Sequence, residues 1–165
     1  MARFLAGAAC AGIVERVVSG TLPAGTCEAD PRASVPELVA RVAEEHGLGS
    51  EAATLYLQLL AMPNPTDRRV RAWNRWNAAA HKAAVAELVT KGLVLEEKRP
   101  KSGRGIVLAG DWHKARNEPG SRPMEYWKIR LLNELGLSEH SDWPAIPLPE
   151  LFEAAWKKAG STPPV

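Results

Sequence analysis

Basic side chains are concentrated between Thr66 and Arg104, and binding of phosphate groups is the chemistry that they could perform. This segment holds ten lysines and arginines against four acidic residues, a balance of +6. Residues 1–65 carry a balance of −3 and residues 105–165 one of −1, so a formal net charge of only +2 hides a basic central segment. Such clustering is the electrostatic footprint of a surface that binds nucleic-acid phosphates. The alternative is a solvated surface with scattered cations.

Other residue types that carry chemistry form no recognisable catalytic pattern. Three of the four histidines, His46, His113 and His140, share no ligand or catalytic spacing. The segment Asp111-Trp112-His113 places an acid beside a base, but sequence neighbours point apart in a strand and no nucleophile accompanies them. The glycines of residues 102–105 form too short a loop to cradle a phosphate ahead of a helix. We therefore expect neither an enzyme nor a cofactor.

The two cysteines, Cys10 and Cys27, lie in unlike surroundings and indicate neither a disulfide framework nor a metal site. The apolar run Phe4–Val14 resembles the core of a secretion signal, but it is short, contains two glycines and is followed by Glu15-Arg16. No segment approaches the roughly 20 apolar residues of a membrane span. The sequence therefore predicts a cytoplasmic protein with free thiols and no membrane partner.

The elements that must position the basic residues follow one another between Leu55 and Leu108. An apolar helix opens at Ser50 and ends at Pro63-Asn64-Pro65, because proline lacks an amide hydrogen and excludes the preceding residue from helical geometry. Thr66 is the expected N-cap of a short helix over residues 67–74. Three of the ten cations lie on that helix.

A third helix and a β-hairpin complete this unit. Residues 77–91 repeat apolar side chains at helical spacing, and Gly92 is placed to end the helix. Two β-type runs, Leu93–Leu95 and Ile106–Leu108, flank a basic turn at residues 99–105 that is rich in Pro, Gly and Ser. We expect a two-stranded hairpin there.

Helix, turn, short helix, third helix and hairpin is the order of a winged helix. The stretch Leu55–Leu108, about a third of the chain, resembles the winged helix-turn-helix superfamily, nearest in style to bacterial regulators of the MarR type. The most specific part is Ala-Glu-Leu-Val-Thr-Lys-Gly-Leu-Val at residues 86–94. Residues 71–112 are also similar to terminal segments of large uncharacterised actinobacterial proteins. The resemblance implies a mainly α fold with a small wing, and a nucleic-acid-binding function such as that of a transcriptional regulator.

The resemblance also implies which residues would contact double-stranded DNA. In a helix-turn-helix the first helix crosses the phosphate backbone and the second enters the major groove. Phosphate contacts would come from the short helix, groove contacts from the third helix and its entry, and further phosphate contacts from the wing. The expected nucleic-acid-binding residues are, in that order, Arg68, Arg69, Arg71 and Arg75; Asn77 and Lys82; and Lys101 and Arg104.

The third helix departs from the pattern of a sequence-reading helix. Its groove-facing positions would be Ala78, Ala79, Lys82, Ala83 and Ala86, and alanine offers no donor or acceptor to a base edge. Contacts mainly to the phosphate backbone would remain. A flat alanine face also suits close packing, so the alternative is a winged-helix protein-protein interaction or assembly module that does not bind DNA.

Two further residues of this region are expected to serve the core. His81 falls on the inner face of the third helix, which favours a hydrogen-bonded core histidine over a base contact. Trp76 lies in the turn between the two helices, where its large apolar body is expected to fill the junction.

Helices are expected on both sides of the winged-helix core. We divide the chain into a helical N-terminal extension (residues 1–49), the core (50–110) and a helical C-terminal tail (111–165). The extension would contain one helix over residues 2–19, a loop over 20–34, and a second helix capped by Ser34. The tail would contain helices over residues 124–135 and 151–156. These flanking helices either bind a protein partner or a second copy of the chain, or fold back onto their own core.

Overall fold

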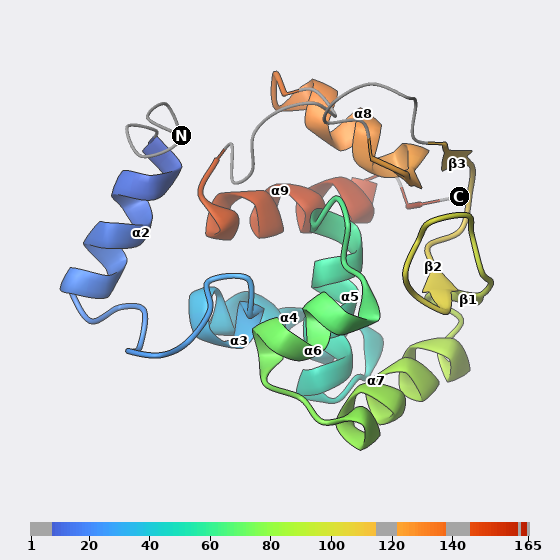
Figure 1. Cartoon of the computed structure of the whole chain (residues 1–165), viewed down its shortest axis with the longest axis horizontal. Coiled ribbons are helices and arrows are strands. Elements are labelled where there is room, and N and C mark those ends of the chain that lie inside the picture. The colour runs from blue at the N-terminus through green and yellow to red at the C-terminus, as the bar shows by residue number, and fades with distance from the viewer. Residues whose placement is uncertain (1–7, 115–121, 138–145, 162, 165) are drawn as a thin grey trace.

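The computed structural model describes residues 8–114, 122–137, 146–161 and 163–164, and over these ranges the fold is mainly helical (Figure 1). The helices are α2 (Ala8–Val18), α3 (Pro31–Ser34), α4 (Pro36–His46), α5 (Ser50–Ala61), α6 (Asp67–Asn74), α7 (Ala78–Thr90), α8 (Tyr126–Glu134) and α9 (Leu148–Ser161). The strands are β1 (Leu95–Glu96), β2 (Ile106–Val107), β3 (Trp112–His113) and β4 (Met124–Glu125). The predicted mainly α fold with a small β-hairpin is confirmed at this level.

Helix α5 forms the centre of the core. Every residue from Ala52 to Ala61 is buried, as expected of a helix that is apolar on nearly all sides. Helices α4, α7 and α9 pack against it, and in Figure 1 it stands between α9 and α7. Of the elements that carry the basic residues, α7 thus packs directly on this buried helix.

The two ends of the chain differ in how they meet this core. In α9, Leu151, Phe152 and Ala155 are fully buried, and the helix packs on α5. The C-terminal tail therefore folds back onto its own core through α9, which is longer than the predicted helix. In α2, by contrast, Val14 and Val18 are exposed at 57% and 81% (Figure 1, left). The part of the predicted first helix at residues 2–7 lies outside the described residues.

The boundaries of α6 and α7 agree with the sequence prediction to within one residue. The Thr66 hydroxyl accepts a hydrogen bond from the amide of Arg69, and the Asn77 side chain accepts one from the amide of Ala80. Arg75 ends α6 in the left-handed conformation, at φ 55°. Local capping chemistry thus sets the lengths of both helices.

Two antiparallel ladders follow α7. In the first, Leu95 pairs with Val107 and Glu96 with Ile106. In the second, Trp112 pairs with Glu125 and His113 with Met124, a ladder that the sequence did not predict. Because β4 takes up the first two residues of the predicted helix over 124–135, α8 begins only at Tyr126.

The predicted cap at Ser34 was wrong. Residues 31–34 are not loop but the short helix α3, whose N-cap is Asp30: its carboxylate accepts a hydrogen bond from the amide of Arg32 at 3.0 Å. Pro31 then occupies the first helical position, which proline favours. Helix α4 starts after Val35 without a side-chain cap.

Candidate nucleic-acid interface

A buried pair of amides fixes the end of α6 against the central helix. The side chains of Gln58 on α5 and Asn74 on α6 exchange two hydrogen bonds of 2.9 Å, and Gln58 also donates to the carbonyl of Ala29 at 2.6 Å. Both residues are buried, so these polar groups satisfy one another away from water. The pair determines how α6 lies on α5.

The turn between α6 and α7 is filled by Trp76, which is 9% exposed and belongs to the hydrophobic core. The Arg32 guanidinium lies over its ring, 5.3 Å from the centroid, and donates to the carbonyl of Asn74 at 2.9 Å. Trp76 thus fills the helix junction, as the sequence indicated.

The arginines of α6 and of its C-cap differ in whether their side chains already donate hydrogen bonds within the protein. Arg68, Arg69, Arg71 and Arg75 are all exposed. Arg69 donates to the carbonyl of Asn64 at 3.2 Å, and Arg75 donates to the carbonyl of Gly25. For the side chains of Arg68 and Arg71 the described part of the chain provides neither a hydrogen bond nor an ion pair. These two are the cations of α6 most available to a phosphate.

Helix α7 exposes the predicted face. Ala78, Ala79, Lys82, Ala83 and Ala86 are exposed, while Leu88 and Ala84 are buried. The side-chain oxygen of Asn77 accepts the capping hydrogen bond at 2.8 Å, which occupies an atom that would otherwise be offered to a base. Lys82 is the cation in the middle of this otherwise alanine-rich face.

Arg104 is not where the sequence prediction placed it. Its side chain is 1% exposed, and its Nη2 lies 2.6 Å from Oε1 of Glu125 on β4. Its Nε also donates to the carbonyl of Ile106 at 3.0 Å. The prediction of a phosphate contact by Arg104 is therefore corrected: a buried carboxylate 21 residues later holds this guanidinium inside the protein. Lys101, by contrast, is exposed.

Glu125 is the centre of this buried ionic cluster. Lys128 Nζ lies 3.0 Å from its second oxygen, the amide of Leu108 donates to its first oxygen at 3.3 Å, and the Trp112 ring stacks on the Arg104 guanidinium. Burial alone would raise the pKa of Glu125, but Lys128 and Arg104 lower it to about 2. Burial lowers the pKa of Lys128 to about 8, with Glu125 opposing the shift. The cluster joins the first hairpin to the second ladder and to α8.

His81 lies at the junction of α6, α7 and the first hairpin. Its Nε2 is 3.5 Å from Oδ1 of Asp67, and its side chain is 13% exposed. Burial lowers the pKa of His81, Asp67 opposes that shift and Arg71 adds to it. His81 thus lies on the inner face of α7, as predicted. Its imidazole faces the Asp67 carboxylate near the protein surface rather than the centre of the core.

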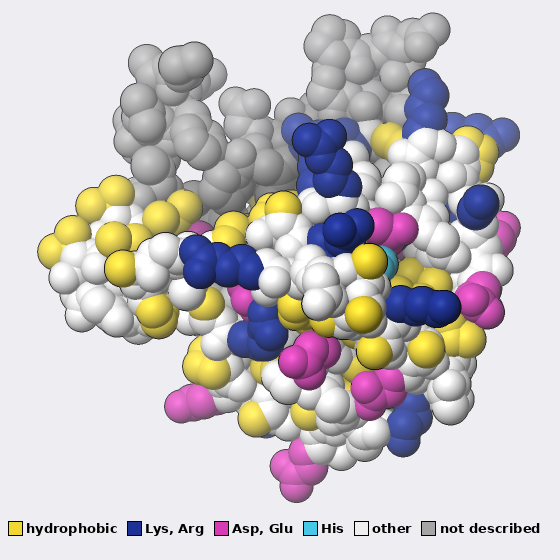
Figure 2. All heavy atoms as spheres, turned by 60° about the horizontal axis from the view of Figure 1, so that its bottom comes forward, with side chains coloured by type: hydrophobic (Ala, Val, Ile, Leu, Met, Phe, Trp, Pro, Cys, Tyr) yellow, Lys and Arg dark blue, Asp and Glu magenta, His cyan; other side chains and the backbone are white. Residues whose placement is uncertain are grey.

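Two adjoining depressions connect α7 to the hairpin loop. Lys82 lines the first, of about 190 Å³, whereas Lys98 and Lys101 line the second, of about 430 Å³. Both depressions share Asp67 and Gly105, so these three lysines border one continuous surface. The amide of Asp67 also donates to the carbonyl of Gly103 at 3.1 Å, which fixes the start of α6 to the hairpin loop. Figure 2 shows lysine and arginine side chains standing out on the face that carries α6 and α7, with carboxylates among them.

Lys98, Glu125 and Lys128 were missed as contributors to this region. Lys98 precedes the turn that the sequence marks as the wing, and its basic character was the available signal. Nothing local to Glu125 or Lys128 in the sequence indicates that they would meet Arg104.

Within the described ranges, no three histidine, cysteine or acidic side chains come together in a way that could hold a metal ion. None of the helices described here has the length and apolar character needed to cross a lipid bilayer. Comparison of the chain with models of protein families, with curated proteins and with solved structures gives no significant match.

Proposed function

We propose that this chain is a winged helix-turn-helix protein that binds double-stranded DNA, mainly through the phosphate backbone. The observation that carries the proposal is the continuous surface bordered by Lys82 of α7 and by Lys98 and Lys101 of the hairpin loop. A helix and a hairpin that present cations side by side match the way in which a winged helix meets a duplex.

The unpaired arginines of α6 extend this cationic surface. Arg68 and Arg71 are exposed on the helix whose first residue is hydrogen-bonded to the hairpin loop. Cations without a protein carboxylate as partner can replace the counterions of the DNA backbone. The chain would use Arg68, Arg71, Lys82, Lys98 and Lys101 as its principal phosphate contacts, with Arg69 and Arg75 contributing donors that their backbone hydrogen bonds leave free.

The proposal predicts little discrimination between DNA sequences. The exposed face of α7 offers four alanines and a single lysine, so few donors or acceptors reach base edges. Binding would rest on charge, and its strength would depend steeply on salt concentration. A role in transcription regulation would then require a partner or a DNA shape to provide specificity.

A second candidate function has its own supporting observation. Ala78, Ala79, Ala83 and Ala86 are all exposed and form a strip of small side chains along α7. Such a strip permits close approach of another protein surface, as in an assembly module.

The first experiment is a fluorescence anisotropy titration of the protein into a labelled random-sequence duplex at low and at physiological salt, with the oligomeric state measured in parallel. Binding that weakens steeply with salt supports the DNA-binding proposal. Absence of binding at low salt rejects it and favours the assembly module.

A further inference from the structure

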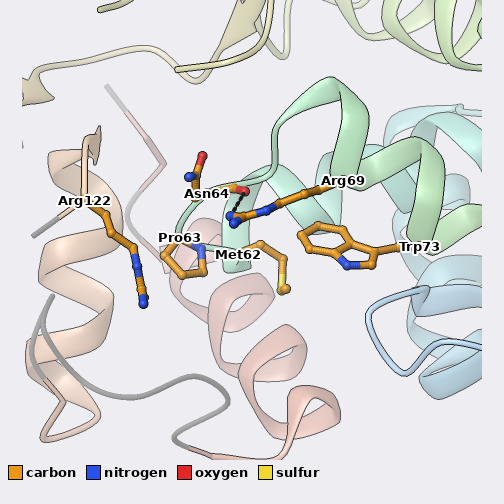
Figure 3. Close-up of a pocket in the computed structure, with 6 residues that line it drawn as sticks. All are labelled: Met62, Pro63, Asn64, Arg69, Trp73 and Arg122. Atoms are coloured by element: carbon orange, nitrogen blue, oxygen red, sulfur yellow. Dashed lines mark hydrogen bonds between the residues drawn. The ribbon is translucent and has the colours of Figure 1, made fainter. Parts of the chain in front are cut away.

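A pocket of about 230 Å³ lies on the side of α6 that faces the end of α5 (Figure 3). Its lining comes from three parts of the chain: the loop that follows α5, helix α6, and the residues just before β4. The lining residues are Met62, Pro63, Asn64, Arg69, Trp73 and Arg122.

The floor of the pocket is apolar. Met62 caps the C-terminus of α5 and is 8% exposed, Pro63 follows it and is buried, and Trp73 of α6 is half-buried. In Figure 3 the Trp73 ring and the Met62 side chain lie on the same side of the pocket, with Pro63 between the two arginines. Such a floor favours an apolar group over water.

Two guanidinium groups reach the same pocket from different elements. Arg69 comes from α6 and Arg122 from the segment before β4, and in Figure 3 they lie on either side of Pro63. One N–H group of the Arg69 guanidinium donates to the carbonyl of Asn64, and its other N–H groups remain available to a ligand. Among the residues that the structure describes, no carboxylate lines the pocket and none pairs with either arginine. Within those residues the charge of the pocket is therefore uncompensated.

We propose that this pocket binds a small organic carboxylate. The carboxylate would lie between Arg69 and Arg122, because a guanidinium presents paired N–H donors that match the two oxygens of a carboxylate. A short apolar body would pack on Met62, Pro63 and Trp73. The proposal does not rest on DNA binding, although Arg69 belongs to both surfaces.

The size and composition of the pocket distinguish this ligand from the phosphates of a duplex. A phosphodiester backbone has no apolar end to bury on the floor, and a pocket of about 230 Å³ accommodates a small molecule rather than a polymer. A free inorganic anion would use the arginines but not the floor. The charge and the apolar body of the ligand are thus both required.

The test is an NMR titration of the full chain with hexanoate, following the indole N–H signal of Trp73, which is assigned by its absence in a Trp73→Phe variant. We expect a saturable shift with hexanoate. Three comparison probes separate the requirements: 1-hexanol removes the charge, acetate removes the apolar body, and inorganic phosphate supplies an anion of another class. Each of the three should bind at least about tenfold more weakly, the equivalent of about 1.4 kcal/mol.

Substitution of the two pocket arginines tests whether hexanoate binds in this pocket. Arg69→Gln and Arg122→Gln should each weaken hexanoate binding about tenfold or more, because each removes a charge-assisted hydrogen bond. Arg68→Gln is the matched control, since Arg68 neighbours Arg69 on α6 but does not line the pocket. Absence of a saturable shift, equal binding of 1-hexanol or phosphate, or equal weakening by Arg68→Gln would each overturn the proposal.

Discussion

Arg104 Nη2 lies 2.6 Å from Glu125 Oε1, and both side chains are almost completely buried, at 1% and 2% exposure. The pair joins the loop of the first hairpin to the strand that precedes α8. Since Lys128 approaches the other oxygen of Glu125, one carboxylate compensates two buried cations. The position of the basic hairpin loop on the body of the protein therefore depends on an ionic contact that water does not screen.

Replacement of Glu125 by glutamine should lower the free energy of unfolding by about 3–5 kcal/mol, because it leaves two buried cations without a countercharge. Urea denaturation followed by circular dichroism measures the loss. Glu153→Gln is the control: Glu153 pairs with Arg41 at the surface, and such a pair contributes about 0–1 kcal/mol. Similar losses of unfolding free energy in the two variants would show that the buried cluster contributes no more to stability than a surface ion pair.

The stability of the protein should rise as the pH is raised from about 8 toward 10. Burial lowers the pKa of Lys128 from 10.5 to about 8, so between these values the unfolded chain binds a proton that the folded chain does not. Under that condition the free energy of unfolding increases with pH. Urea midpoints at pH 8 and pH 9.5 test the sign. Lys128→Met should abolish the increase, and an increase of unchanged size in that variant would assign it to other groups.

His81 should titrate below its ordinary pKa of 6.5, because burial disfavours its charged form. The midpoint can be followed through the imidazole Cε1–H signal in NMR spectra. Asp67→Asn should lower it further, since the carboxylate raises the pKa, whereas Arg71→Gln should raise it. A midpoint at or above 6.5 in the unaltered protein, or shifts of the opposite sign in the variants, would contradict the arrangement of these three residues.

Substitution of Asn74 by alanine should destabilise the protein by about 1–3 kcal/mol, since it leaves the buried amide of Gln58 with unsatisfied groups. Denaturant unfolding gives the value, and Asn133→Ala on the exposed face of α8 is the control, with an expected change within about 0.5 kcal/mol. If the two variants were equally stable, the Gln58–Asn74 pair would not hold α6 in place.

The sequence predicted the central helices well because local chemistry determines their limits. Proline at residues 63 and 65 ends α5, Thr66 and Asn77 cap the next two helices, and Gly92 follows α7 with φ 69°. Each signal acts within one helical turn, so it can be identified without knowledge of the fold.

The N-cap of α3 shows how two candidate capping residues close together in the sequence can mislead a prediction. Ser34 and Asp30 are both suitable N-caps, and each precedes a proline at a short interval. The structure uses Asp30, whose carboxylate also pairs with the Arg32 side chain at 2.8 Å, an additional contact that capping preferences do not include.

The candidate site was only partly predictable. Arg68, Arg71, Lys82 and Lys101 are exposed as expected, because polar positions in amphipathic helices and turns usually face solvent. The same reasoning predicted that Arg104 is exposed, but its side chain is buried. Its burial depends on Glu125, which a second ladder of two-residue strands brings to it and which also pairs with Lys128 of α8. Strands of that length have no alternating pattern that a sequence could reveal.

The proposed phosphate-binding surface is tested most directly by the salt dependence of duplex binding in a charge-matched pair of variants. Lys98→Ala with Lys101→Ala removes two cations from the hairpin loop, and Arg130→Ala with Lys157→Ala removes two exposed cations from α8 and α9. Affinity for a random-sequence duplex should fall in the first variant, with a slope of log K against log salt reduced by about two, and remain unchanged in the second. Equal losses in both variants, or no binding by the unaltered protein at low salt, would contradict a DNA-binding surface formed by α6, α7 and the hairpin.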